Sequence, residues 1–305
     1  MDKLTYGAGA ILVCVLLAVS GCSMLDQREE GVGPSSAVIK DQVHWTLPTD
    51  PYSPARDQAL ELQAFDTVRA PCMRDAGFPQ VEIGWDASAP VPATLAGDGV
   101  SQVFNEDVAG RYGYRMAPDS RNLNEAATLA AGEGGLWAQE SQAFWDALDT
   151  CNDKADAALA GEDDEVRQDD GSPASDITSQ LDKLQADTTA SDLADAAAAW
   201  RTCMAPQGII DLPAQPWSPG AMLPDSLLQR WDWAPTGTAS ADEIQVASAD
   251  AACRRSSGWF DALYEAEWNL RQAFVDEHRT ELEPVRQALD TARDRYRSII
   301  AGTSA

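Results

Sequence analysis

Residues 282–299, LEPVRQALDTARDRYRSI, decide the fold of this chain. Apolar side chains recur there at alternating intervals of three and four residues, and they are Leu282, Val285, Leu289, Ala292, Tyr296 and Ile299. This spacing puts all six on one face of a helix and is typical of a coiled-coil-like contact. We call these six residues the C-terminal apolar stripe. We expect a long C-terminal helix, in which Pro284 either introduces a kink or marks the start of a new helix.

Helical spacing also occurs upstream of the stripe. One helix begins at Ser53-Pro54, where a capping residue precedes a proline at the first helical position, and Gly77 ends it. Its apolar residues recur every fourth position and are Leu60, Ala64, Val68 and Cys72. Further helices are expected at about 136–160, 177–184 and 193–204, and from Ala241 almost to the end. The fold class is therefore mainly α.

The segments between these helices are rich in turn-forming residues. Residues 78–120 contain many Gly, Pro and Asp and are expected to be irregular, with a short strand at 81–85. Residues 205–238 contain six prolines and three tryptophans, which predicts a loop-rich region. The acidic, apolar-poor residues 161–174 are the best candidate for a linker. We therefore expect a helical N-terminal lobe at 53–160 and a C-terminal lobe at 175–302, in a body of one or two lobes.

The N-terminus has the pattern of an export signal. A short start with Lys3 precedes an apolar run at residues 8–19, which is too short for a membrane-spanning helix of roughly 20 residues. The run ends in Val19-Ser20-Gly21-Cys22, which closely resembles the cleavage motif of bacterial lipoprotein signals. The resemblance implies that residues 1–21 are a signal peptide and that Cys22 carries a diacylglyceryl group with palmitate-like chains. The alternative is an ordinary signal peptide that leaves Cys22 free.

The lipid on Cys22 would hold the protein on the extracytoplasmic face of the cell membrane. Two acyl chains anchor a protein stably, because each buried methylene contributes about 0.8 kcal/mol. Residues 22–52 are polar and contain several Pro and Gly, so we interpret them as a flexible tether. Within the tether, Val43, Trp45 and Leu47 either add a short strand or dock on the body.

The chain is strongly acidic, with a formal net charge of −27 over 305 residues. This charge argues against nucleic acid as a partner, because binding to phosphates depends on Lys and Arg. It also argues against a polybasic contact with anionic lipid. The simplest interpretation is a solvated acidic surface, since no cationic ligand is specified by the pattern.

Four cysteines follow Cys22, namely Cys72, Cys151, Cys203 and Cys253. An exported chain meets an oxidising compartment, so this even number predicts two disulfides. Four cysteines allow three connectivities. A zinc site is the rival interpretation, but closely spaced Cys-x-x-Cys pairs are absent from the sequence.

An internal similarity favours one of these connectivities. Cys72-Met73 is followed by Gly77-Phe78 and Val81, and Cys203-Met204 by Gly208-Ile209 and Leu212. In both places a helix ends, a glycine caps it, and an apolar residue brings the outgoing chain back. If the chain is a diverged duplication, each half links its own helix end to its own later helix. This hypothesis predicts Cys72–Cys151 and Cys203–Cys253, whereas coincidence leaves the pairing open.

Two short elements carry a further resemblance. Trp200-Arg201-Thr202-Cys203-Met204…Gly208 has the form W-x-x-C-M…G, and Ala247-Ser248-Ala249-Asp250-Ala251-Ala252-Cys253 has the form A-x-A-D-x-x-C. Together with the cleavage motif, they resemble a group of uncharacterised secreted lipoproteins of high-GC Gram-positive bacteria. The resemblance covers mainly residues 195–300. It implies a lipoprotein with a helical, disulfide-stapled body, and it implies no activity.

No catalytic, metal or cofactor motif stands out in the sequence. The two histidines, His44 and His278, lie in the tether and on the long helix, and His278 with Glu281 is better explained by a solvated helix face than by metal binding. Among the ten tryptophans, Trp217, Trp231 and Trp233 form a candidate ligand platform for sugar or peptide. The alternative is that they build the core of a loop-rich region.

These observations favour a non-enzymatic surface lipoprotein that binds a protein partner or belongs to an envelope complex, with the C-terminal apolar stripe as the contact. In the alternative interpretation, the stripe packs on the protein's own helices. The second functional hypothesis is a cell-wall glycan binder or hydrolase that uses the tryptophans and a pair of acids. Exposed tryptophans beside two carboxylates would favour the second hypothesis, and buried tryptophans would favour the first.

Overall fold

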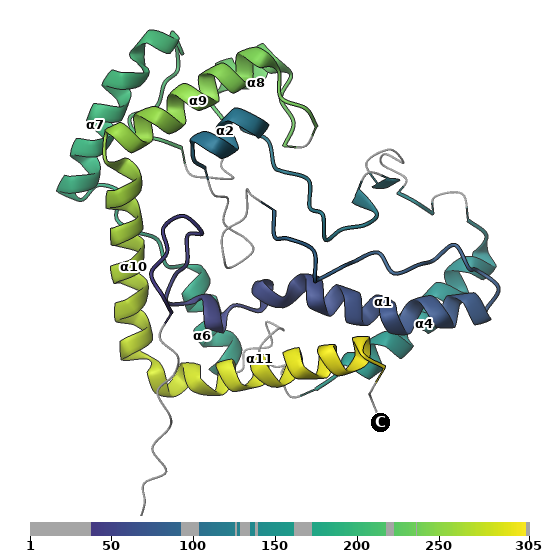
Figure 1. Cartoon of the computed structure of the whole chain (residues 1–305). Helices are drawn as coiled ribbons and strands as arrows, with labels where there is room; N and C mark the ends of the chain where they lie inside the picture. Colours follow the sequence, from purple (N-terminus) through teal and green to yellow (C-terminus); the bar gives the residue numbers. More distant parts are fainter. Residues whose placement is uncertain are drawn as a thin grey trace, which may run out of the picture. The chain divides into compact units, whose positions relative to one another are not determined.

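The computed structural model describes residues 38–92, 104–125, 127–128, 135–137, 140–161, 173–217, 223–235 and 237–302. The predicted signal peptide, Cys22 and most of the predicted acidic linker lie outside these residues. The described part, from residue 38 onward, belongs to one compact unit and is built from α-helices joined by loops (Figure 1). The predicted mainly helical fold is confirmed. Among the described residues, no helix is both long and apolar enough to cross a membrane.

The first group of helices contains α1 (Gln58–Asp75), α4 (Gln142–Leu159) and α11 (Arg279–Ile300). The hydroxyl of Ser141 caps α4 by accepting a hydrogen bond from the backbone N–H of Phe144. All three helices contribute to one apolar cluster, which includes Ala64, Leu159 and Tyr296. Helix α11 therefore packs on helices of the predicted N-terminal lobe.

The second group contains α7 (Ser191–Met204), α9 (Ala241–Ser256) and α10 (Trp259–Glu277). The short helices α2 (Glu106–Tyr112) and α8 (Asp225–Trp231) pack on α9 through the cluster around Ala247. Helix α6 (Pro173–Asp182) packs on α11 through Ile177 and Leu181. The continuous helical pattern after Ala241 is divided into three helices, because Gly258 and His278 interrupt it.

The C-terminal apolar stripe lies in the protein's own core. Its six residues are at most 7% exposed, and they pack against η1 (Asp50–Tyr52), α6, α1 and α4. The expectation of a stripe exposed to a protein partner is therefore wrong, and the alternative contact with the protein's own helices is confirmed. Pro284 lies inside α11, in its first two turns, so it does not start a new helix.

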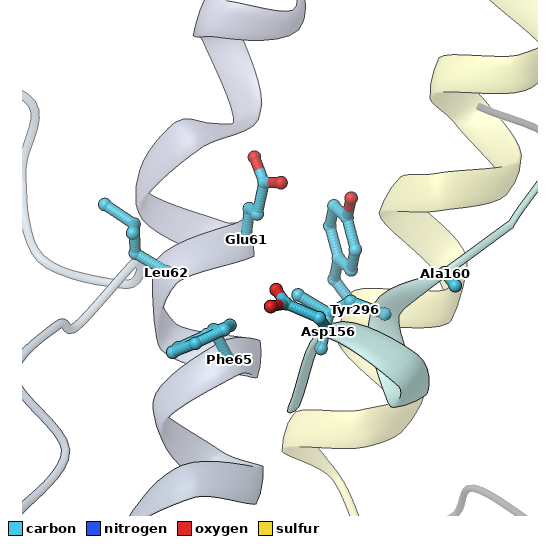
Figure 2. A pocket seen from close by; sticks show the side chains of 7 residues that line it. Glu61, Leu62, Phe65, Asp156, Ala160 and Tyr296 are labelled. Atoms are coloured by element: carbon cyan, nitrogen blue, oxygen red, sulfur yellow. The ribbon is translucent and has the colours of Figure 1, made fainter. Parts of the chain in front are cut away.

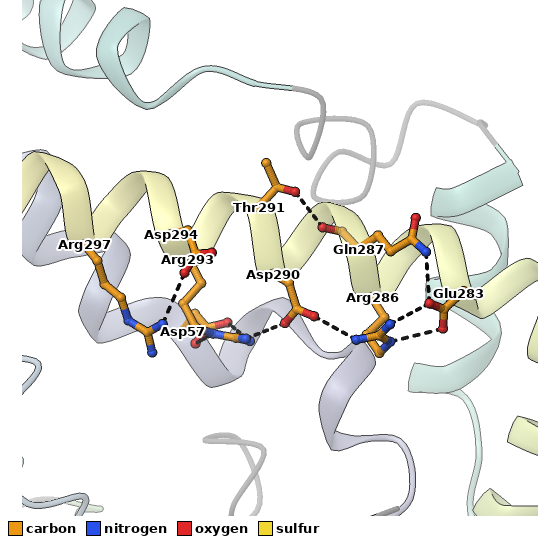
Figure 3. A network of polar contacts seen from close by, with 9 residues as sticks. All are labelled: Asp57, Glu283, Arg286, Gln287, Asp290, Thr291, Arg293, Asp294 and Arg297. Carbon is orange, nitrogen blue, oxygen red and sulfur yellow. Dashed lines mark hydrogen bonds and ion pairs between the residues drawn. The ribbon is translucent and has the colours of Figure 1, made fainter. Parts of the chain in front are cut away.

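Ion pairs link polar side chains of α11 to one another and to Asp57, which precedes α1. Figure 3 shows Arg286 bonded to Glu283 and Asp290, and Arg293 bonded to Asp57 and Asp290. The two bonds from Arg293 to Asp57, of 2.9 and 2.7 Å, join α11 to the residue that precedes α1. The hydrogen bond to Asp57 raises the pKa of Arg293 above its ordinary value.

The segments between the helices differ from the predicted irregular structure in two ways. Residues 106–112 and 225–231 form the short helices α2 and α8, which the sequence pattern missed. The expected strand at 81–85 is reduced to one antiparallel bridge between Trp85 and Asn122. This segment is attached to α1 by a 2.7 Å hydrogen bond from the N–H of Gly84 to buried Asp66.

The end of the predicted tether is packed on the body. Leu47 is 1% exposed, and Tyr52 joins the apolar cluster of α6 and α11. By contrast, Val43 is 70% exposed, and Trp45 contacts Tyr264 on α10 through an edge-to-face ring pair. Packing therefore begins before residue 52, the predicted end of the tether.

Candidate functional site

Both disulfides have the pairing that the internal similarity predicts. Cys72–Cys151 links α1 to α4, and Cys203–Cys253 links α7 to α9. The two glycines of the similarity both adopt positive φ, with values of +95° at Gly77 and +66° at Gly208. Each glycine follows a helix end, where the left-handed conformation suits a residue without a Cβ. The similar sequences therefore form similar helix ends.

A buried ionic cluster lies beside the second disulfide. Asp250 is fully buried and accepts hydrogen bonds from Trp200 Nε1 at 2.7 Å and from Arg254 Nε and Nη2 at 2.9 and 3.0 Å. The hydroxyl of Tyr114 donates a fourth bond at 3.2 Å. Burial next to this carboxylate raises the pKa of Tyr114 well above its ordinary value. The carboxylate is thus surrounded by donors from α7, α9 and the segment after α2.

The same cluster extends to the N-terminal end of α9. Glu243 is also fully buried, and its Oε2 accepts a 3.1 Å bond from Arg115 Nε. Its Oε1 accepts a 3.2 Å bond from the backbone N–H of Tyr114. Buried charges persist in proteins when they are paired and hydrogen-bonded, as these are. The arrangement fixes the segment after α2 on α9.

The two short sequence elements, W-x-x-C-M…G and A-x-A-D-x-x-C, meet in this cluster. The tryptophan of the first element donates to the aspartate of the second, and their cysteines form a disulfide with a Cα–Cα distance of 5.6 Å. The elements thus connect α7 to α9 by one covalent and one polar link. Because the cluster is buried and its carboxylate is satisfied by its neighbours, it holds the fold together and offers no open substrate site.

The three tryptophans of the candidate platform pack around the same cluster. The indole of Trp217 lies 5.4 Å from the ring of Tyr114 and 5.8 Å from that of Trp200, between ring centroids. Trp231 stacks on Tyr114 at 5.8 Å, and Trp233 packs on the same apolar residues. All three are partly buried. The structure thus brings the three residues together, as components of an aromatic core.

A separate pocket lies among α1, α4 and α11. It has a volume of about 290 Å³. Figure 2 shows the carboxylates of Glu61 and Asp156 directed toward the same space as the rings of Phe65 and Tyr296. The remaining lining residues are Leu62, Leu159 and Ala160. The pocket combines two acids with aromatic and aliphatic side chains, but none of the platform tryptophans lines it.

The histidines occupy peripheral positions. Nδ1 of His44 lies 2.7 Å from Asp41, in the turn before Leu47, and His278 lies between α10 and α11, with Nδ1 3.4 Å from Glu281. Within the described residues, no group of three or more His, Cys, Asp or Glu side chains has the geometry to hold a metal ion. Comparison of the chain with protein-family models, curated proteins and solved structures finds no match.

Proposed function

We propose that this protein is a lipoprotein held by Cys22 on the extracytoplasmic face of the cell membrane, and that it acts there by binding rather than by catalysis. The observation that carries the proposal is the use of its cysteines. The four that follow Cys22 are consumed by two disulfides. Cys22 takes part in neither of them and directly follows the motif Val19-Ser20-Gly21.

The disulfides also support export. Structural disulfides persist in oxidising compartments, and an exported chain reaches one. In the chain-entropy model, loops closed over 79 and 50 residues contribute about 4 kcal/mol each to stability. The chain therefore gains a large part of its stability outside the cytoplasm, which agrees with an extracytoplasmic site of action.

The arrangement of the aromatic and acidic residues supports a binding role. Trp200 is fully buried and bonds Asp250, and the partly buried Trp217 and Trp231 pack on Tyr114 beside it. The pocket with Glu61 and Asp156 is lined by other residues. A glycan hydrolase would combine a tryptophan platform with an acid pair in one groove. The separation of these features favours binding over the glycan-hydrolase alternative.

Replacement of Cys22 by alanine tests the anchor. The wild-type protein should sediment with membranes and incorporate radiolabelled palmitate, and Cys22→Ala should lose the label and leave the membrane fraction. Ser23→Ala is the matched control, since it alters the residue next to the motif, and it should behave like the wild type. A Cys22→Ala protein that remains in the membrane fraction would show that the anchor is assigned incorrectly.

A further inference from the structure

Helix α10 presents two aromatic rings to the loop that precedes Leu47. Tyr264 and Trp268 are one helical turn apart, with ring centroids separated by 6.1 Å, so they share a face of the helix. Glu265 lies beside them and its side chain is 57% exposed. The loop formed by residues 38–46 lies against this face, and in Figure 1 it is the purple segment beside α10.

The loop holds the tyrosine ring in one position. The hydroxyl of Tyr264 donates a 2.7 Å bond to the carbonyl of Thr46 and accepts a 3.0 Å bond from the N–H of Asp41. Trp45 adds a third ring, whose centroid lies 5.1 Å from that of Tyr264 in an edge-to-face arrangement. Its φ of +52° is an unfavourable backbone conformation for a residue with a large side chain. Trp45 thus contacts Tyr264 from a strained backbone conformation.

A cation already occupies this aromatic group. Lys40 Nζ lies 5.7 Å from the ring centroid of Tyr264 and 5.3 Å from that of Trp268, within the range of cation–π attraction. The same ammonium lies 2.7 Å from Glu265 Oε2. The rings and the carboxylate thus supply the two attractions that an organic cation requires. Lys40 is partly exposed, whereas Tyr264 is only 2% exposed, so a ligand reaches the tyrosine ring only when Lys40 moves away.

We propose that Tyr264, Trp268 and Glu265, with Trp45 packed against Tyr264, form a binding site for a quaternary ammonium group, with Lys40 as an internal occupant that the ligand displaces. Aromatic faces bind quaternary ammonium well, because its charge is spread over methyl groups. A lysine ammonium is a compact and strongly hydrated charge, so it loses more hydration on the same rings. This inference deepens the proposed binding role and names the chemistry of its ligand.

Saturation-transfer NMR on the full-length chain, in a maltoside detergent that contains no choline, tests the site with choline as the probe. The methyl signal of choline should receive saturation, and that of its neutral isostere dimethylbutanol should not. Lys40→Met, which removes the charge and keeps the length, should bind choline about fivefold more tightly, because the competing ammonium no longer occupies the two rings and Glu265. Trp268→Ala should bind at least tenfold more weakly.

Two further variants separate loss of the site from loss of the fold. Trp268→Phe should retain most of the affinity, since it keeps a ring in place, and Trp145→Ala should leave choline binding unchanged, since it alters an exposed tryptophan on α4. Equal binding of choline and dimethylbutanol, or unchanged binding in both Lys40→Met and Trp268→Ala, would overturn the proposal. The membrane fractionation of Cys22→Ala does not depend on the choline-binding experiment. The lipid anchor and the ammonium site can therefore be disproved separately.

A choline group can belong to a free solute or to a lipid head group. Flotation of the Cys22→Ser variant with phosphatidylcholine vesicles, compared with phosphatidylglycerol vesicles, distinguishes these sources. Selective flotation with phosphatidylcholine that Trp268→Ala abolishes would assign the site to a lipid head group. Binding of soluble choline without flotation would assign it to a free solute. If neither binding of soluble choline nor flotation with phosphatidylcholine is observed, the proposed site is wrong.

Discussion

The indole Nε1 of Trp200 donates a 2.7 Å hydrogen bond to Oδ1 of Asp250, and each residue precedes the cysteine of its own helix by three positions. The polar contact and the Cys203–Cys253 disulfide therefore lie about one helical turn apart along α7 and α9. This relationship explains why the two sequence elements have a tryptophan and an aspartate at matched distances from cysteine. It also makes the pair a direct test of how the second helix group is stabilised.

Removal of the buried carboxylate should be costly. Asp250→Ala leaves the guanidinium of Arg254, which is 1% exposed, without its counter-charge, and such losses cost about 3–5 kcal/mol. Trp200→Phe removes one donor and keeps most of the ring, so it should cost about 1–3 kcal/mol. Denaturant unfolding measures both, with Trp145→Phe as an exposed control. A cost below about 1 kcal/mol for Asp250→Ala would contradict the role assigned to the cluster.

The two disulfides should differ in their rate of reduction. Cys203 is exposed, whereas Cys72 is partly buried and Cys151 is 1% exposed. Thiol–disulfide exchange requires access of a thiolate to a sulfur atom. Mild dithiothreitol followed by alkylation and peptide mapping should therefore label Cys203 and Cys253 first. Earlier labelling of Cys72 and Cys151 would show that exposure does not control the order.

The buried C-terminal stripe should affect stability. Leu289 is 1% exposed, and its replacement by alanine should cost about 2–5 kcal/mol, because the cavity left in the core is filled only in part. Leu123→Ala is the matched control, since this leucine is 58% exposed. Thermal and denaturant unfolding give the comparison. Equal stability of the two variants would indicate that the stripe is not packed in the core.

Acid should break the hydrogen bond between Trp231 and Asp242. Hydrogen bonds from Trp231 Nε1, at 2.7 Å, and from Arg230 hold the pKa of Asp242 below its ordinary value of 3.8. Because the folded pKa is lowered, the stabilising contact is present above the unfolded pKa and is lost as the pH falls through the folded pKa. The indole N–H resonance of Trp231 in NMR spectra should therefore shift with a midpoint below 3.8. Asp242→Asn should abolish this shift, and its persistence would assign the effect to another group.

Local patterns predicted much of the fold. The spacing of apolar residues indicated α1, α4, α7 and α11, because the period of a helix appears directly in the sequence. Gly77 and Gly208 indicated helix ends, because the left-handed conformation favours glycine. The pairing of the cysteines followed from the similarity between the two halves, since each half repeats one helix end.

The tertiary structure decided how these elements are used. The sequence shows that α11 has an apolar face, but periodicity does not reveal which surface covers it, and the structure places that face on α1, α4, α6 and η1. The same applies to Trp217 and Trp231, which the sequence places in a loop-rich region and the structure packs, partly buried, against Tyr114. Lys40 and Trp268 are more than 200 residues apart, so only folding could bring them together. The sequence by itself therefore determined the longer helices and their apolar faces. Contacts between distant residues, which depend on packing in three dimensions, determined which side chains are buried and which remain exposed.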